Sequence, residues 1–178
     1  MLPIRVSPVA LIRSRPTAEA PDQAPDLLSP CFTGREEVLT RLHAMLQEGV
    51  PAILVPDPEG PGRGAAQCVL AYLRRHGAGY SVVARLRASS AETLAEDLDE
   101  VARGVYTADP DQADVTDSLD RWLLVVEGLE DPALLAAQFP AWLQARVILL
   151  DAGPAAVGLG QVVTVPRPSK HETLDFLR

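Results

Sequence analysis

Cysteine is scarce in this sequence, which argues against both disulfide bonds and a structural zinc site. Only two cysteines are present, Cys31 and Cys68, and they lie far apart with no Cys-x-x-Cys pair. A disulfide framework or a structural zinc site needs more cysteines at closer spacing. We therefore expect both residues to be ordinary buried thiols.

Basic residues are also in short supply. The chain has 16 Lys and Arg against 24 Asp and Glu, which gives a formal net charge of -8. Such a balance repels a phosphate backbone and an anionic membrane surface, and it offers no basic stripe. We therefore expect no nucleic acid and no membrane among the partners.

Long apolar runs are missing as well. Crossing a bilayer takes about 20 consecutive apolar residues, whereas the apolar runs here are short and the N-terminus has no signal-type apolar stretch. We expect a soluble, cytoplasmic protein. A length of 178 residues suits one α/β domain with an appendage and is too short for two full domains.

Candidate acid–base and metal groups are sparse too. The three histidines, His43, His76 and His171, are expected to lie far apart on helix surfaces, which argues against a metal cluster or a histidine-based catalytic group. The carboxylates of AEDLDEVA at 95–102 are typical of a solvated helix face. Neither group predicts catalysis.

What is present begins with an irregular N-terminal region. Residues 1–13 contain β-branched residues interrupted by Pro3 and Pro8, a pattern typical of an edge strand or an extended arm. Residues 14–31 are rich in Pro, Ala and Asp with no sustained period, which predicts a linker. We expect 1–31 to be an arm and linker, and 32–178 to be the folded domain.

Expected strands and helices alternate along the rest of the chain. Helices are predicted within 32–49, over 64–76, from Ser90 onward, and over 131–144 with a break at Pro140; strands are predicted over 52–56, 80–87, 121–128, 145–151 and 161–165. The strands are apolar throughout, so both of their faces should be buried. The pattern predicts an α/β fold in which a parallel sheet of about five strands is flanked by helices.

A loop rich in glycine and proline, PDPEGPGRGA at 56–65, follows the first of these strands. Loops at the carboxyl ends of parallel strands are where such sheets bind ligands. A working phosphate loop reads G-x-x-x-x-G-K-[ST], in which backbone amides surround the phosphates, lysine neutralises them and the hydroxyl binds magnesium. Here the same window, 57–64, keeps the last glycine as Gly62 and adds Gly60, but Asp57, Arg63 and Gly64 replace the first glycine, the lysine and the hydroxyl residue.

The surroundings of the loop indicate a family. The phrases FTGREEVLTRL at 32–42, RWLLVVEGLEDP at 121–132 and ARVILLD at 145–151 resemble those of the STAND class of P-loop NTPases, in particular its bacterial NB-ARC-like branch. The resemblance covers 32–178 and implies a P-loop NTPase-like sheet, truncated before the helical lid and winged helix of that family. Residues 169–178, which start with a capping-box spacing, would begin the first lid helix. The chain ends abruptly there, as a fragment would.

Carried over position by position, the resemblance implies a degenerate site. Glu127 stands at the Walker B aspartate and keeps a carboxylate that is one methylene longer, so a magnesium contact would need rearrangement. Gly128 stands where an acidic or amide residue would orient water, and Asp151 and Ala152 stand where a sensor arginine is usual. We expect no catalytic residue, a vestigial phosphate loop at Gly60, Gly62, Arg63 and Gly64, and a vestigial metal position at Glu127.

The sequence is compatible with three interpretations of function. The first is a regulatory or oligomerisation module, a pseudo-NTPase that binds protein partners and needs no cofactor. The second is a switch domain that binds ATP or ADP with Mg²⁺ and uses Arg63 in place of lysine. The third is a plain α/β protein-interaction domain. If the strand at 121–127 lies next to the strand at 52–56, NTPase ancestry is favoured, whereas a flavodoxin-like order favours the third reading.

Some single residues also have simpler interpretations. Glu130 and Asp131 are typical of an N-terminal cap for the helix after Pro132. Arg35 would contact nucleotide in an intact relative, but a surface salt bridge at a helix start is the simpler role. Glu127 is equally compatible with a solvated carboxylate at a strand end.

Overall fold

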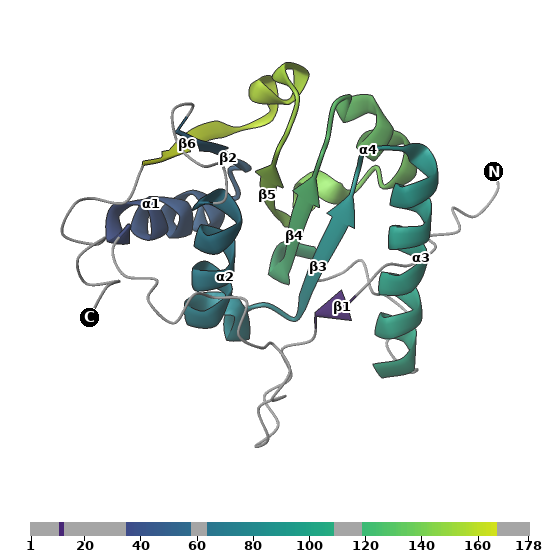
Figure 1. The fold of residues 1–178 in the computed structure, drawn as a ribbon. Coiled ribbons are helices and arrows are strands. Elements are labelled where there is room, and N and C mark those ends of the chain that lie inside the picture. The colour runs from purple at the N-terminus through teal and green to yellow at the C-terminus, as the bar shows by residue number, and fades with distance from the viewer. Residues whose placement is uncertain (1–10, 13–34, 58–63, 109–118, 167–178) are drawn as a thin grey trace.

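The computed structural model describes residues 11–12, 35–57, 64–108 and 119–166. These residues form an α/β fold with three layers, in which a central sheet is covered by helices on both faces (Figure 1). The predicted fold class, a parallel sheet of about five strands flanked by helices, is confirmed. Residues 169–178 and most of 1–31 lie outside the described residues, and with them the expected linker and lid helix.

The sheet has six strands in the order β1-β3-β4-β5-β2-β6. Five of them run parallel, and β1 pairs antiparallel with β3 at the edge, where an edge strand was expected within 1–13. The strands are β1 Leu11–Ile12, β2 Ala52–Pro56, β3 Val82–Arg87, β4 Trp122–Glu127, β5 Arg146–Leu150 and β6 Gln161–Val165.

The helices follow the predicted alternation. They are α1 Glu36–Gln47, α2 Gly64–His76, α3 Ala91–Ala108 and α4 Pro132–Gln138, with short 3-10 turns η1 Gly77–Gly79, η3 Trp142–Gln144 and η4 Pro154–Leu159. The carboxylate of Asp131 accepts a hydrogen bond of 2.9 Å from the amide of Ala133, so it caps α4 as predicted. The helix ends at Gln138, before Pro140, and the chain continues as η3.

Two hydrophobic clusters lie on the two faces of the sheet. One packs α1 and α2 against alternate residues of the strands, such as Leu54, Val125 and Ile148. The other packs α3, α4, η3 and η4 against the intervening residues, such as Val126 and Leu149. Because successive strand residues point to opposite faces, strands buried on both sides read as continuous apolar runs, as the sequence indicated.

The strand order matches neither of the two arrangements considered above, the one that would favour NTPase ancestry and the flavodoxin-like one. β5 lies between β2 and β4, so the strand at 122–127 is not adjacent to the strand before the glycine-rich loop. If the five parallel strands β2 to β6 are numbered 1 to 5 in chain order, their order across the sheet is 2-3-4-1-5. This order also differs from the flavodoxin order 2-1-3-4-5. Strand order alone therefore does not decide between NTPase ancestry and a plain interaction domain.

Among the helices that the structure describes, none combines the length and the apolar character needed to span a membrane.

Candidate functional site

The sheet has a topological switch point beside β2. From β2 the chain passes to α2 on one face of the sheet, and from the neighbouring β5 it passes to η4 on the other face. Open α/β sheets bind their ligands at the carboxyl ends of strands whose connections diverge in this way. β2 ends at Pro56 and α2 begins at Gly64, so both ends of the glycine-rich segment lie at this point of the sheet.

The structure describes only the two ends of that loop. Asp57 is half-buried, and its backbone amide donates to the carbonyl oxygen of Val165 on β6 at 3.1 Å. Gly64 is the first residue of α2. Gly60, Gly62 and Arg63, three of the four positions predicted for the vestigial phosphate loop, lie outside the described residues.

Arg35 lies against the start of α2. Its backbone is in the left-handed region, with φ at 60° directly before α1, and this directs the chain into the helix. Its guanidinium Nη1 donates to the carbonyl oxygen of Gly64 at 3.0 Å and contacts the Cys68 sulfur at 3.7 Å. Arg35 thus joins the start of α1 to the start of α2.

The contact with Arg35 affects what position 64 can hold. A Cβ atom added to Gly64 would lie 2.9 Å from Nη1 of Arg35, so a serine or threonine fits there only if the guanidinium moves. Cys68, one turn further along α2, is fully buried, as predicted, and burial raises the pKa of its thiol.

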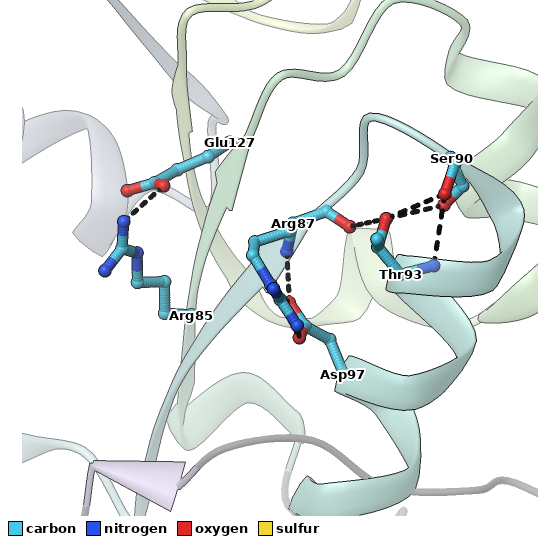
Figure 2. Close-up of polar contacts among 6 residues, drawn as sticks. All are labelled: Arg85, Arg87, Ser90, Thr93, Asp97 and Glu127. Carbon is cyan, nitrogen blue, oxygen red and sulfur yellow. Dashed lines mark hydrogen bonds and ion pairs between the residues drawn. The ribbon is translucent and has the colours of Figure 1, made fainter.

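Glu127 ends β4 and is bound by an arginine. Nη2 of Arg85, on the neighbouring β3, lies 2.6 Å from Oε2 of Glu127, as Figure 2 shows. The hydrogen bond to Glu127 raises the pKa of the Arg85 guanidinium. At the position predicted as a vestigial metal site, the carboxylate is therefore paired with a protein cation.

A second arginine on β3 corrects another expectation. Asp97 of α3 was expected on a solvated helix face, but it is only 6% exposed. Its Oδ2 accepts from the backbone amide of Arg87 at 2.5 Å, and its Oδ1 accepts from Nε of the same residue at 2.9 Å (Figure 2). The periodicity of α3 turns Asp97 toward the sheet, and Arg87 at the end of β3 compensates the buried charge.

The loops after β4 and β5 lie beside each other. Gly128 has φ at 68°, and its amide donates to the carbonyl oxygen of Leu150 at 3.0 Å. Asp151 is exposed and also has a positive φ of 48°, which aspartate tolerates better than most residues. The structure places Gly128 and Asp151 at the expected strand ends.

The histidines are not all far apart, contrary to the expectation. The rings of His43 on α1 and His76 on α2 stack with centroids 4.0 Å apart. Nδ1 of His43 is 3.1 Å from the hydroxyl of Tyr72, which is 2.7 Å from that of Tyr80. Within the described residues, no group of three or more His, Cys, Asp or Glu is arranged to hold a metal ion.

A shallow groove runs along α3 beside α4. Its lining is mainly acidic and includes Glu92, Glu96 and Glu100, with Arg87, Arg103 and Gln138 at its borders. None of its lining residues comes from the switch point, from the start of α2 or from Glu127. The groove therefore adds nothing to the site that the sequence predicted.

No protein-family model matches the chain, and no curated protein matches it significantly.

Sequence reasoning missed the arginine partners on β3. The signal was present in the strand itself, because Arg85 and Arg87 interrupt VVARLR, a run otherwise made of residues that prefer burial. Both arginine side chains are largely exposed, and β4 and α3 supply their partners, Glu127 and Asp97.

Proposed function

We propose that the chain is a regulatory or oligomerisation module of a bacterial STAND-type signalling protein, acting in the cytoplasm as a pseudo-NTPase that no longer hydrolyses nucleotide. The observation that carries this proposal is that an arginine lies beside each position where the family resemblance calls for a magnesium contact. Arg85 binds Glu127, and Arg35 lies against Gly64.

The first of these contacts disfavours a metal at the end of β4. Mg²⁺ requires carboxylate or water oxygens in a near-octahedral arrangement. The Oε2 atom of Glu127 instead binds a guanidinium at 2.6 Å. A metal ion would have to displace that cation before the carboxylate became a ligand.

The second contact disfavours a metal ligand at the start of α2. Gly64 has no hydroxyl group, and the space that a side chain there would enter is within 2.9 Å of Arg35. Without a hydroxyl ligand and with an engaged carboxylate, both protein contacts that normally hold magnesium in a P-loop NTPase are lost.

Support for the ancestry comes from the position of the loop. The glycine-rich segment borders the switch point of a parallel sheet, where a phosphate loop is expected, and α2 begins directly after it. If nucleotide does not control the module, partner proteins do, and the proposed partners are an effector domain, a sensor domain or further subunits.

The test is phosphate release from ATP with magnesium, measured for the wild type and for a triple reversion, Arg63→Lys, Gly64→Ser and Glu127→Asp. The wild type should release no phosphate above background. Magnesium-dependent phosphate release gained by the reversion supports a degenerate NTPase, since the restored groups are those that the family uses. Magnesium-dependent turnover by the wild type would contradict the proposal.

A further inference from the structure

A cluster of imidazole and phenol rings joins α1 to α2 at the end of the sheet opposite the glycine-rich loop. His43 comes from α1, Tyr72 and His76 come from α2, and Tyr80 lies just before β3 begins. The imidazole planes are inclined by only 16° at a centroid separation of 4.0 Å. The two phenol rings extend the cluster toward the sheet through the hydrogen bonds between His43, Tyr72 and Tyr80.

The charges around this pair are mostly positive. α2 contributes Arg75 next to His76, and Arg146 at the start of β5 acts on Tyr80. The acid that α1 contributes, Glu36, already binds Arg75 through two contacts of 2.5 and 2.6 Å. Partial burial lowers the pKa of His76, and the nearby His43 and Arg75 lower it further.

We propose that the stacked His43 and His76 form a proton-operated latch between α1 and α2. With both imidazoles neutral, the rings stack and α1 stays packed on α2. A proton taken up by one ring places a cation against its stacked neighbour and close to Arg75. A second proton places two like charges within 4.0 Å of each other, so acidification loosens the contact between the helices.

The latch has a mechanical connection to the switch point. Arg35, directly before α1, donates to Gly64 and contacts Cys68, both in the first part of α2. Movement of α1 away from α2 therefore withdraws the guanidinium from the start of α2, beside the glycine-rich loop. The latch itself does not depend on the function proposed above, because its rings belong to the opposite end of the sheet.

The folded state favours the neutral imidazole of His76, because partial burial and the neighbouring His43 and Arg75 oppose its protonation. A base whose pKa is lower in the folded state contributes stability that is complete above its unfolded value, about 6.5 for histidine. That contribution is lost as the pH falls through the folded value. The latch is therefore closed above about pH 6.5 and opens as the pH falls further below that value.

The test is amide hydrogen exchange in α1 at pH 7.5 and pH 5.5, corrected for intrinsic exchange rates and compared with the core strand β4. In the wild type, protection of α1 should fall between pH 7.5 and pH 5.5, while β4 keeps its protection. His76→Gln and His43→Gln should each abolish the acid-dependent fall. His171→Gln is the matched control and should behave as the wild type.

Two results would overturn the proposal. One is α1 protection that does not change with pH in the wild type, and the other is an acid-dependent fall that persists in His76→Gln. If the variants do not fold, an NMR titration of the imidazoles in the wild type tests the same proposal. At least one imidazole should titrate below the ordinary value of about 6.5, whereas three ordinary titrations would show that no latch exists.

Discussion

Arg85 and Glu127 lie side by side on β3 and β4 and are joined by an ion pair of 2.6 Å between Nη2 and Oε2. Arg85 is opposite Val125 in the strand register, two residues before the level of Glu127, so its long side chain extends along the sheet to reach the carboxylate. The pair lies at the carboxyl end of the parallel strands, where ligands bind in folds of this class. Arg85 therefore engages the carboxylate that, in the proposed function, has lost its magnesium contact.

Removing the arginine should make Glu127 available to a metal ion. With Mn²⁺ as a paramagnetic probe, the wild type should show no selective broadening of the Gly128 amide signal, and Arg85→Ala should show it, because the carboxylate has lost its partner. Arg121→Ala, on an exposed residue before β4, is the control. The stability cost of Arg85→Ala should be below about 1 kcal/mol, since the pair is partly exposed. Broadening in the wild type would contradict this account.

Asp97 should contribute far more to stability than its neighbours on α3. Asp97→Ala leaves the backbone amide and guanidinium of Arg87 without their acceptor. We expect a loss of about 1.5–3 kcal/mol in the free energy of unfolding, the range for hydrogen bonds to charged groups. Urea unfolding measures this loss, with the exposed Glu96→Ala as the control at about ±0.5 kcal/mol. Equal effects of the two substitutions would show that the pair is not structural.

Gly160 should tolerate no side chain. A Cβ atom there would lie 2.0 Å from the carbonyl oxygen of Pro51, so Gly160→Ala forces the start of β6 away from the chain entering β2. We expect a destabilisation of about 1–3 kcal/mol. Gly158→Ala is the control, because a Cβ at Gly158 has no neighbour within 4 Å. A melting temperature unchanged by Gly160→Ala would contradict the close approach of these segments.

The hydroxyl of Tyr72 should stabilise the fold at neutral pH and less so in alkali. Tyr72→Phe removes the group between His43 and Tyr80, at a cost of about 1 kcal/mol. Burial raises the pKa of Tyr72 above its ordinary value of 10.0. A raised acid pKa gives stability that is complete below about pH 10 and declines as the pH rises further. Chemical unfolding between pH 7 and pH 11 should therefore show a shallower alkaline decline in the variant than in the wild type.

The alternation of helices and strands was predictable because each segment carries its own local signal. The strand Trp122–Glu127 is apolar along nearly its whole length, and α1 repeats its buried residues at helical spacing. The order of the strands was not predictable in the same way. Placing β5 between β2 and β4 depends on packing between segments that are distant in the sequence.

The side-chain contacts that the sequence did not predict also depend on packing between segments that are distant in the sequence. His43 and His76 are separated by a strand and a loop in the sequence, yet α1 and α2 bring them into a stack because both helices cover the same face. The sequence identified Glu127 as a strand-end carboxylate but not its partner, because the pairing of β3 with β4 is not encoded in either strand alone.

Thermal unfolding with and without millimolar ATP or ADP plus magnesium tests the central claim most directly. A nucleotide present at 100 times its dissociation constant would stabilise the folded state by about 2.7 kcal/mol, or about 5–11 °C in melting temperature. The loss of a working site predicts no shift at any nucleotide concentration. A clear shift that disappears in Arg63→Ala would contradict the account and make the glycine-rich loop a functioning phosphate site.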